Sequence, residues 1–482
     1  MINTEFNARI NAKTNAKEPN LAKQPVEIEL QIHSLSDQGL GGGEHNERPV
    51  WVRNALPGET VRARILKRRG GQRFADGQLL EQGSPDRVPS ACAYFPRCGG
   101  CATQHLAPEA QLAHKAKQLA DQLQLQGIEP TSWRSPVALL RLGYRRKARL
   151  GVRLVGETVL VGFRESFSNR VARIDACLTL TPELSRLITP LKATIAQTSE
   201  PQTVPQIELA QGDSRCAVIV RHLQPLSAGD VALWQSFAQN WHVEVLMQSK
   251  GYDTLTPIAA TQPQMQLLHY QLPEYGLTLG FYPHYFTQVN APMNRELVRT
   301  VMGYLGKLRG RVVADMFCGI GNFTLPLARA GALAIGVEAS AEAVAMAAKN
   351  ARANGVDSRC AFYAADLYGD TGALMSQVTP QENDSAPQSG IDTQLNHFGA
   401  APQALILDPP RSGAGPNLHS WAAMPSVAQI VYVSCNPVTF ASDAKQLHEL
   451  GYRLEQVGVY DMFPGTAHVE TVGNFIRQPI GG

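Results

Sequence analysis

The stretch RVVADMFCGIGNFTLPLA, residues 311–328, decides the fold of the C-terminal part of this chain. Its first half is an apolar, β-branched run with Asp315 at its end, as expected for a buried strand. Gly319 and Gly321 then predict a tight turn, and a helix follows. A strand, a glycine turn and a helix in this order are typical of a parallel sheet, where backbone N–H groups at the positive helix end can meet a ligand.

The alternation of strand and helix continues after this stretch. Four further apolar runs, LAIGVEAS, CAFYAAD, ALILDPP and IVYVSCNP, are separated by helical segments. The pattern predicts a doubly wound, Rossmann-like α/β domain over residues 281–482, with a flexible polar insertion at 376–402. The residues that end the five strands are Asp315, Glu338, Asp366, Asp408 and Cys435. Ligands of open α/β sheets bind at the carboxyl ends of the strands, so these side chains should share one crevice.

The predicted crevice has features of an adenosine-binding site. Glu338 follows Asp315 by 23 residues and ends the next strand, where a carboxylate can bind ribose hydroxyls. The glycine turn lacks the complete G-x-G-x-x-G run. We therefore expect S-adenosylmethionine, which has no pyrophosphate, in preference to NAD. The alternative at each of these positions is a glycine turn with polar residues that cap a helix.

Cys435 is the candidate nucleophile of this domain. A lone buried cysteine is usually core packing, but Cys435 lies where its strand stops, beside Asp408 in the predicted crevice. Carbon 5 of uracil can attack a methyl sulfonium once a thiolate has added to carbon 6. A base must then remove the carbon-5 proton. Glu470 in MFPGTAHVETV is the candidate base, with His468 two residues earlier; an exposed carboxylate is the alternative for Glu470.

Length and composition set the limits for the rest of the chain. With 482 residues, and at roughly 150 residues per domain, the chain should contain about three domains. A hydrophobic fraction of 44% and a charged fraction of 18% indicate a globular protein, and no apolar run is long enough to span a bilayer. Residues 1–25 are rich in Asn, Ala and Lys and lack the apolar core of a signal peptide. We expect a disordered tail there, and a cytoplasmic protein without membrane contact.

Residues 26–83 predict a small β-barrel of the oligonucleotide-binding kind. Short alternating strands are separated by turn signals, among them the Gly41-Gly42-Gly43 run and Pro57-Gly58. Six basic residues lie close together in this region: Arg62, Arg64, Lys67, Arg68, Arg69 and Arg73. They form either a solvated strand face or a phosphate-binding surface.

Three of the eight cysteines, Cys92, Cys98 and Cys101, lie together in CAYFPRCGGC. In a reducing compartment this grouping indicates a metal site before disulfides. Cys177 is the expected fourth ligand, because Cys216 lies inside the alternating strand SRCAVIV and is expected to fill the core. Four thiolates suit either zinc or an iron-sulfur cluster, and the spacing alone does not choose between them.

Residues 84–280 are expected to form a central α+β domain that binds RNA. A helix is predicted near residues 108–126, and the block LRLGYRRKARLGVRL follows it. Its basic residues are Arg141, Arg145, Arg146, Lys147, Arg149 and Arg153, with no acidic residue among them. Two acid-free basic strands in a chain with a net charge of +3 are typical of a surface that follows a nucleic-acid backbone.

Six motifs in one order resemble the RNA uracil-C5 methyltransferases, which use S-adenosylmethionine. They are FTQVN (286–290), DMFCGIGNFTLPLA, GVEAS, DPPRSG, YVSCNP and MFPGTAHVE. The N-terminal strands resemble the TRAM barrel of this family, and C-x5-C-x2-C with a distant cysteine resembles its [4Fe-4S] site. A chain with both is similar to the type named for uridine 1939 of 23S ribosomal RNA, because the tRNA-directed type lacks the cluster and the other 23S type lacks the barrel. The resemblance covers about residues 26–480.

The resemblance implies roles for single residues. Cys435 would be the nucleophile and Glu470 the base that removes the proton. The positions that match S-adenosylmethionine binding are Gln288, Phe317, Asn322, Glu338, Asp366 and Asp408. The cluster ligands would be Cys92, Cys98, Cys101 and Cys177. We expect a monomer whose partner is 23S ribosomal RNA.

Two departures from the family pattern concern the local contacts. Asp366 stands where an Asn is also found, and Gly465 replaces a frequent His shortly before the candidate base. Gly465 puts the local hydrogen bonding in question.

Two alternatives remain at this stage. A base-amino methyltransferase also has an acid or amide followed by two prolines, but it needs an aromatic residue next to stack the flipped base, and here Arg411 follows. Arg411 is instead expected to contact uracil oxygens or the RNA backbone. A non-catalytic RNA-binding factor in ribosome assembly would have a broken nucleophile or cofactor site, whereas Cys435 and the cofactor positions are all present.

Overall fold

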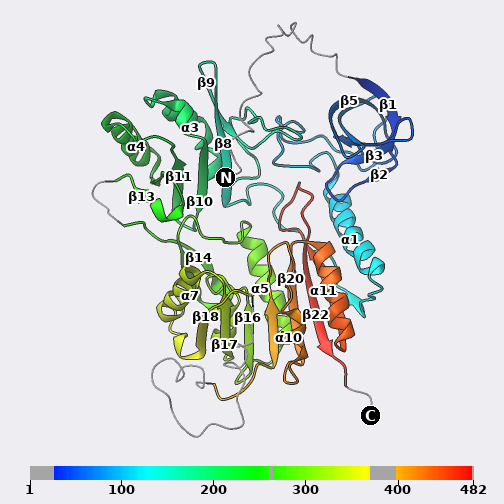
Figure 1. The fold of residues 1–482 in the computed structure, drawn as a ribbon, viewed down its shortest axis with the longest axis vertical. Coiled ribbons are helices and arrows are strands. Elements are labelled where there is room, and N and C mark those ends of the chain that lie inside the picture. Colours follow the sequence, from blue (N-terminus) through cyan, green and yellow to red (C-terminus); the bar gives the residue numbers. More distant parts are fainter. Residues whose placement is uncertain (1–25, 260–263, 370–397, 480–482) are drawn as a thin grey trace, which may run out of the picture. The chain divides into compact units, whose positions relative to one another are not determined.

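The computed structural model describes residues 26–259, 264–369 and 398–479. The predicted tail 1–25 and residues 376–397 of the predicted insertion lie outside the described residues. The chain divides into two compact units, the first made of Met1–Leu35 and Leu40–Ser84, the second of Ser36–Gly39 and Pro85–Gly482 (Figure 1). No helix within the described ranges is both long and apolar enough to cross a membrane.

The first unit contains a six-stranded sheet in the order β1-β5-β6-β4-β3-β2. The strands are β1 (Glu27–Gln31), β2 (Ser34–Leu35), β3 (Gly41–Glu44), β4 (Pro49–Arg53), β5 (Thr60–Arg69) and β6 (Gln72–Leu79). Alternate residues such as Val50, Val52 and Val61 are fully buried, so the sheet encloses its own small core. This strand-rich unit is consistent with the predicted barrel.

The prediction that the Gly41-Gly42-Gly43 run is a turn was wrong. These residues lie in strand β3, which pairs with β2 and β4. A Cβ atom on Gly41 would lie 2.7 Å from the Ala55 carbonyl oxygen, and one on Gly43 would lie 2.5 Å from the Gln31 carbonyl oxygen. The glycines therefore allow a close backbone approach within the strand.

The central region of the second unit contains a six-stranded sheet in the order β13-β12-β11-β10-β8-β9. They are β8 (Lys147–Val155), β9 (Thr158–Gly162), β10 (Gln206–Gln211), β11 (Cys216–Arg221), β12 (Val243–Gln248) and β13 (Thr256–Pro257). Helices α3 (Ile188–Gln197) and α4 (Ala228–Trp241) pack on this sheet through Leu191, Trp234 and Phe237. Helices and mixed strands occur together here, as the sequence predicts.

The C-terminal part holds an eight-stranded sheet in the order β18-β17-β16-β19-β20-β22-β21-β7. Its strands are β16 (Val312–Met316), β17 (Leu333–Glu338), β18 (Cys360–Ala364), β19 (Ala404–Leu407), β20 (Gln429–Ser434), β21 (Tyr452–Tyr460), β22 (Glu470–Arg477) and β7 (Ser132–Trp133). Strands β16 to β20 are parallel, whereas β22 is antiparallel to both of its neighbours. The strand order reverses between β16 and β19, which is where a doubly wound sheet opens its ligand crevice.

Two cores cover the faces of this sheet, because neighbouring residues of a strand point to opposite faces. Val313 packs in one core with helix α5 (Ala291–Leu305), and Val312 packs in the other with helix α11 (Pro437–Glu449). The other helices of this part are α6 (Thr324–Arg329), α7 (Ala341–Ala353) and α10 (Leu418–Ala423). The sheet is thus buried on both faces, as expected for a parallel sheet.

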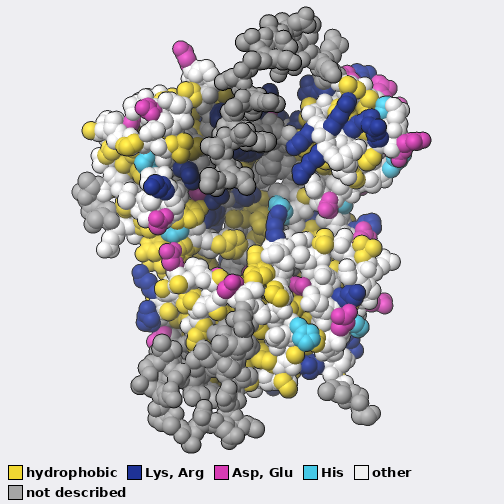
Figure 2. Space-filling view, viewed as in Figure 1, with side chains coloured by type: hydrophobic (Ala, Val, Ile, Leu, Met, Phe, Trp, Pro, Cys, Tyr) yellow, Lys and Arg dark blue, Asp and Glu magenta, His cyan; other side chains and the backbone are white. Residues whose placement is uncertain are grey.

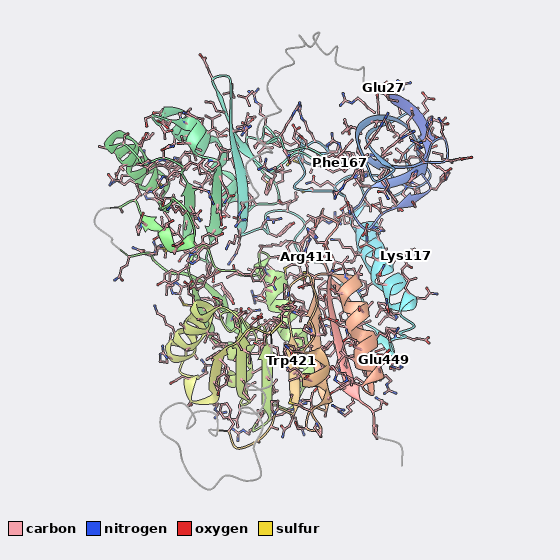
Figure 3. The ribbon with its side chains drawn as sticks, viewed as in Figure 1. Glu27, Lys117, Phe167, Arg411, Trp421 and Glu449 are labelled. Carbon is pink, nitrogen blue, oxygen red and sulfur yellow. The ribbon has the colours of Figure 1, made fainter. Side chains whose placement is uncertain are left out.

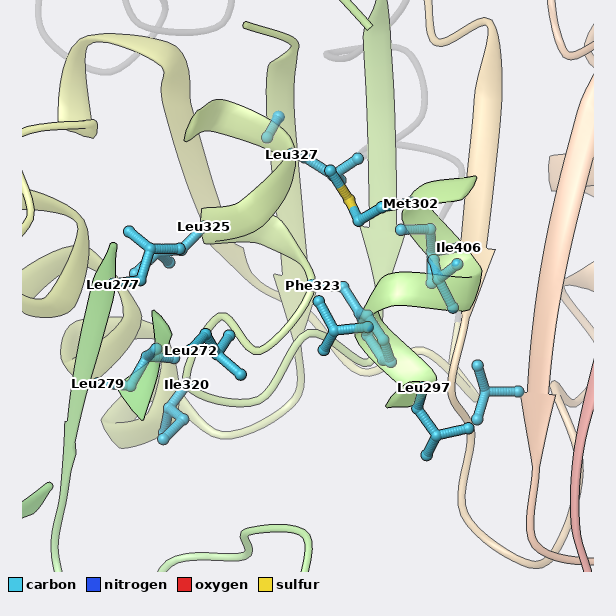
Figure 4. Packing of buried hydrophobic residues seen from close by; sticks show 14 of the residues in the cluster. Leu272, Leu277, Leu279, Leu297, Met302, Ile320, Phe323, Leu325, Leu327 and Ile406 are labelled. Carbon is cyan, nitrogen blue, oxygen red and sulfur yellow. The ribbon is translucent and has the colours of Figure 1, made fainter. Parts of the chain in front are cut away.

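Two elements from the predicted central domain pack on the C-terminal part. Leucines of the hairpin β14 (Leu268–Leu272) and β15 (Leu277–Phe281) enter the α5 core (Figure 4). Helix α1 (Pro108–Leu125) places Leu119 and Leu123 in the α11 core. Both predicted domains lie within the second compact unit. The domain boundaries therefore stay predictions.

The remaining short elements are α2 (Pro182–Ser185) and the 3-10 turns Pro201–Thr203, Tyr252–Thr254, Pro273–Tyr275 and Asp357–Arg359.

Candidate active site

Two carboxyl groups lie at the switch point of the sheet. Asp315 lies in β16 and is fully buried, and Asp408 directly follows β19. The pKa of each is raised to about 7, mainly by burial and, for Asp315, also by the charge of Asp408. Thr324 donates its hydroxyl to one Asp315 carboxylate oxygen at 2.5 Å, while the other oxygen has no hydrogen-bond partner among the described residues. This oxygen is a buried acceptor without a donor in the described part of the chain.

The loop after β16 is shaped to approach a ligand. Phe317 has a φ of 67° and Gly321 a φ of 95°, both in the left-handed region. The Glu338 carboxylate accepts hydrogen bonds from the backbone N–H groups of Gly319 and Ser340, each at 3.1 Å. Glu338 is thereby fixed at the carboxyl end of β17, where the sequence places it.

The other predicted cofactor positions differ in how they are held. Asn322 is already engaged, because its amide oxygen accepts from Tyr270 at 2.9 Å and from Asn294 at 3.0 Å. Asp366 is exposed and accepts from the backbone N–H of Tyr368 at 2.9 Å. The Gln288 side chain is half-buried and makes no hydrogen bond within the described part of the chain. Its amide is free for a ligand.

The register of strands β20 and β22 brings Cys435 and Glu470 together. Ser434 pairs with Thr471 in this antiparallel ladder, so the next position along places Cys435 opposite Glu470. Cys435 is half-buried at the end of β20, and Glu470 is 3% exposed at the start of β22. The candidate nucleophile and the candidate base therefore lie at the same edge of the sheet. Glu470 is buried, not the exposed carboxylate of the alternative interpretation.

Arg411 acts electrostatically on both of these residues. Burial raises the pKa of Cys435, and Glu470 and Asp408 add to the effect, whereas the charge of Arg411 and its hydrogen bond to the thiol lower it. Burial and Asp408 raise the pKa of Glu470 well above its ordinary value, and Arg411 again opposes the shift. The backbone oxygen of Arg411 accepts from the Asn436 side chain at 2.9 Å, which joins the Arg411 loop to the turn after Cys435. Figure 3 shows Arg411 at this end of the sheet.

His468 is a weak candidate for the base. One guanidinium nitrogen of Arg411 lies 2.6 Å from Nδ1 and 3.1 Å from Nε2 of His468, and it donates to whichever of the two carries no proton. Burial lowers the pKa of His468 to about 4, with a further contribution from Arg411. A group that takes up a proton only at such low pH removes a proton poorly near neutrality. The low pKa of His468 argues against His468 and leaves Glu470 as the candidate base.

The loop that leads to Glu470 is held by residues that sequence reasoning did not single out. Lys115 of helix α1 donates to the Asp461 carboxylate at 2.7 Å and to the Phe463 carbonyl oxygen at 3.2 Å. The side chains of this ion pair are 2% and 8% exposed. Tyr144 donates its hydroxyl to the Pro464 carbonyl oxygen at 3.1 Å. A lysine in a helix gives no local signal of such a role, because its partner is 346 residues away.

Gly465 forms its hydrogen bonds through its backbone N–H and carbonyl groups. Its N–H donates to the Gln111 side chain at 3.0 Å, and its carbonyl oxygen accepts from Ala102 and Thr103 at 2.9 and 3.0 Å. Its φ of 74° favours glycine. Ala102 directly follows Cys101, so the loop before the candidate base is joined to the cysteine segment.

The four predicted metal-ligating cysteines line one small pocket of about 20 Å³: Cys92, Cys98, Cys101 and Cys177. Cys216 lies apart from them in the core of the central sheet, as expected. Burial raises the pKa of Cys98 to about 11 and that of Cys101 to about 12. Within the described residues, no group of three or more His, Cys, Asp or Glu side chains is arranged to hold a metal ion. The thiols converge, but the metal site stays a prediction.

The basic side chains divide into paired and free ones. In the first unit Arg62 pairs with Glu29 at 3.2 Å and Arg64 with Asp76 at 3.7 Å. Lys67, Arg68 and Arg69 are exposed and form no ion pair within the described ranges. Figure 2 shows Lys and Arg side chains gathered on this unit. The phosphate-binding interpretation therefore applies best to the unpaired end of β5.

The sequence and the fold of the chain are similar to those of known methyltransferases. A family model for tRNA (Uracil-5-)-methyltransferase matches residues 232–478. A 23S rRNA (uracil(1939)-C(5))-methyltransferase from Acidithiobacillus ferrooxidans is 42% identical over 92% of this chain and 96% of its own length. One with the same name from Hahella chejuensis is 40% identical over 94% of this chain and 98% of its own. In fold, the chain is similar to a Pyrococcus abyssi tRNA (uracil-54, C5)-methyltransferase solved with S-adenosyl-L-homocysteine, with a TM-score of 0.68, 24% identity, and coverage of 93% and 100%.

Proposed function

The chain belongs to the RNA uracil-C5 methyltransferase family, and we propose that it transfers a methyl group from S-adenosylmethionine to carbon 5 of a specific uridine in 23S ribosomal RNA. The observation that carries the proposal is the β20–β22 register, which sets Cys435 opposite Glu470 beside Asp408 and Arg411. This chemistry needs a nucleophile and a base at one site, and the two residues supply both.

Cys435 begins the reaction. Its thiolate adds to carbon 6 of uracil, and the electrons of the carbon 5–carbon 6 double bond move to carbon 5 and the neighbouring carbonyl. Burial raises the pKa of the thiol, so the thiolate needs help, and Arg411 provides it through charge and a hydrogen bond. Arg411 thus opposes the effect of burial on the nucleophile.

Glu470 ends the reaction. S-adenosylmethionine, when bound, supplies the methyl group to carbon 5. The Glu470 carboxylate then removes the carbon-5 proton, the electron pair restores the double bond, and the Cys435 thiolate leaves. A raised pKa strengthens Glu470 as a base once it is ionised.

The polar groups around the crevice fit the cofactor. The amide of Gln288 is half-buried and has no hydrogen-bond partner in the described part of the chain, and one oxygen of the buried Asp315 lacks a donor there as well. Glu338 lies where it can accept from ribose hydroxyls. The carboxyl groups of Asp315 and Asp408, once ionised, also favour a bound cation, and the cofactor contains a sulfonium. Gln288, Phe317, Asn322, Glu338, Asp366 and Asp408 are accordingly proposed to hold S-adenosylmethionine.

A [4Fe-4S] cluster is the second proposed group. The convergence of Cys92, Cys98, Cys101 and Cys177 on one pocket supports it, since four thiolates are the usual ligand set of this cluster. Burial raises the pKa of the Cys98 and Cys101 thiols, which opposes their ionisation. Binding of the cluster would offset this effect, because iron displaces the thiol protons. Cys101 lies next to the segment that binds Gly465, so the cluster would stiffen the loop before Glu470. The monomeric state and the cytoplasmic location stay predictions.

The proposal is tested by tritium release from RNA that contains carbon-5-tritiated uridine. Only replacement of the carbon-5 hydrogen releases tritium to water, so a base-amino methyltransferase and a non-catalytic assembly factor both predict none. Mapping of 5-methyluridine in 23S ribosomal RNA, from cells with and without the protein, identifies the target. Methyl transfer without tritium release would contradict the proposal.

A further inference from the structure

A large groove lies beside the cysteine pocket and outside the active site. Its volume is about 1070 Å³, above the roughly 300–1,000 Å³ of ordinary small-molecule pockets. Its walls come from the cysteine segment, from the β8–β9 hairpin and from residues 165–173. Tyr94, Phe95 and Cys98 line both the groove and the cysteine pocket. The two spaces thus share one wall.

The groove is strongly basic. Four arginines line it: Arg97, Arg153, Arg170 and Arg173. Glu165 is the acidic residue among its lining residues, and Arg97 neutralises it at 2.6 Å. The guanidinium groups of the other three arginines are exposed, and none makes a hydrogen bond or ion pair within the described residues. Asp175 acts electrostatically on Arg173 but is paired with Lys192 at 2.7 Å. The groove therefore offers cations without a direct ion pair, which attract a polyanion.

The basic block that the sequence singled out is different, because most of its charges are already used. Arg146 pairs with Asp213 at 2.5 Å, and Arg149 pairs with Glu208 at 3.1 Å. Lys147 donates to the Tyr285 carbonyl oxygen at 2.5 Å, and burial lowers its pKa to about 8. Arg153, at the far end of the same strand, is the member of this block that faces the groove. Free positive charge thus lies in the groove more than on the rest of strand β8.

The groove also offers apolar surface between its charges. Val155 is 58% exposed, and Leu160 and Tyr94 are half-buried in the lining. Ser168 and Asn169 add neutral polar groups. Charges that meet phosphates, with apolar and aromatic surface that meets bases, are the combination that single-stranded nucleic acid requires.

We propose that this groove binds a single-stranded segment of the RNA substrate, away from the target nucleotide. The proposal rests on the proposed function for the identity of the RNA. The cysteine segment separates the two sites, since Cys98 lines the groove and Ala102 and Thr103 bind the loop before Glu470. One RNA could then contact both sides of this segment, which would add affinity and select the RNA that carries the target.

The test measures the salt dependence of RNA binding by the full-length protein. The probe is a fluorescein-labelled 12-nucleotide oligouridine, and the variants are Arg153→Gln, Arg170→Gln and Arg173→Gln. Each lost contact with a single strand should flatten the slope of log affinity against log salt by about 0.7. Arg309→Gln is the matched control, because Arg309 is exposed before β16, at the end of the sheet opposite to the crevice. Its slope should equal that of the wild-type protein.

Two outcomes decide the inference. Flatter slopes in the groove variants, together with a higher KM for a 23S ribosomal RNA transcript and unchanged thermal unfolding, support it. Slopes that equal the wild-type value in all three variants overturn it, and the groove would then be solvated surface or a site for an acidic protein. Absence of tritium release from the wild-type protein would instead overturn the proposed function and leave the slope measurement valid.

Discussion

Replacement of Lys115 tests whether the loop before Glu470 is held by the buried ion pair. In Lys115→Met the Asp461 carboxylate stays buried without its cation, and the Phe463 carbonyl oxygen loses its donor. Removal of one partner of a buried pair costs about 3–5 kcal/mol. Over a compact unit of roughly 400 residues, an unfolding entropy of about 2.1 cal/mol/K per residue converts this loss into roughly 4–6 °C of Tm.

The matched control is Lys117→Met on the same helix. Lys117 pairs with Asp121 at 2.7 Å, but these side chains are 70% and 49% exposed. An exposed pair four residues apart contributes only about 0.3–0.5 kcal/mol, so the Tm should hardly change. The double variant Lys115→Met/Asp461→Leu should regain part of the lost Tm, because two apolar side chains leave no unpaired charge.

The catalytic assay separates the loop from general stability. A loosened loop should misplace Glu470 more than Cys435, because the loop leads directly into Glu470, whereas Cys435 follows strand β20. At a temperature well below unfolding, Lys115→Met should slow proton removal and accumulate a covalent enzyme–RNA adduct that carries label from methyl-labelled cofactor. A Tm within about 1 °C of the wild-type value and no excess adduct would refute the role of Lys115.

Three further predictions concern the site residues. Cys435→Ala should bind RNA but form neither adduct nor product, whereas Glu470→Gln should transfer methyl and stall as an adduct that survives denaturing electrophoresis; wild-type turnover of Glu470→Gln would point to another base. The rate should rise with pH, because both residues act deprotonated and burial raises the pKa of each; Arg411→Gln should move the rise to higher pH, and an unchanged profile would contradict the assigned role of Arg411. Anaerobically purified protein should contain about four irons per chain, lost in Cys177→Ser and kept in Cys216→Ser; zinc without iron would exclude the proposed cluster.

Local patterns of the sequence predict the parts of the fold that depend on neighbouring residues. The apolar runs and glycine turns place strands β16 to β20, because the side-chain period of a strand and the conformational freedom of glycine are local properties. Parallel strands share one carboxyl edge, so the same patterns bring Asp315, Asp408 and Cys435 to one edge of the sheet. The cysteine spacing likewise anticipates a common pocket with Cys177.

Other features follow only from the tertiary structure. Strand β22 lies between β20 and β21, which buries Glu470 and sets it opposite Cys435. Lys115 and Arg149 form ion pairs within the fold, with Asp461 and Glu208. Arg153 lines the groove and forms no ion pair in the described part of the chain. Residue type determines the charge that each side chain carries. Its pKa, its partner and its access to RNA depend on desolvation and on groups hundreds of residues away, which only the folded chain brings together.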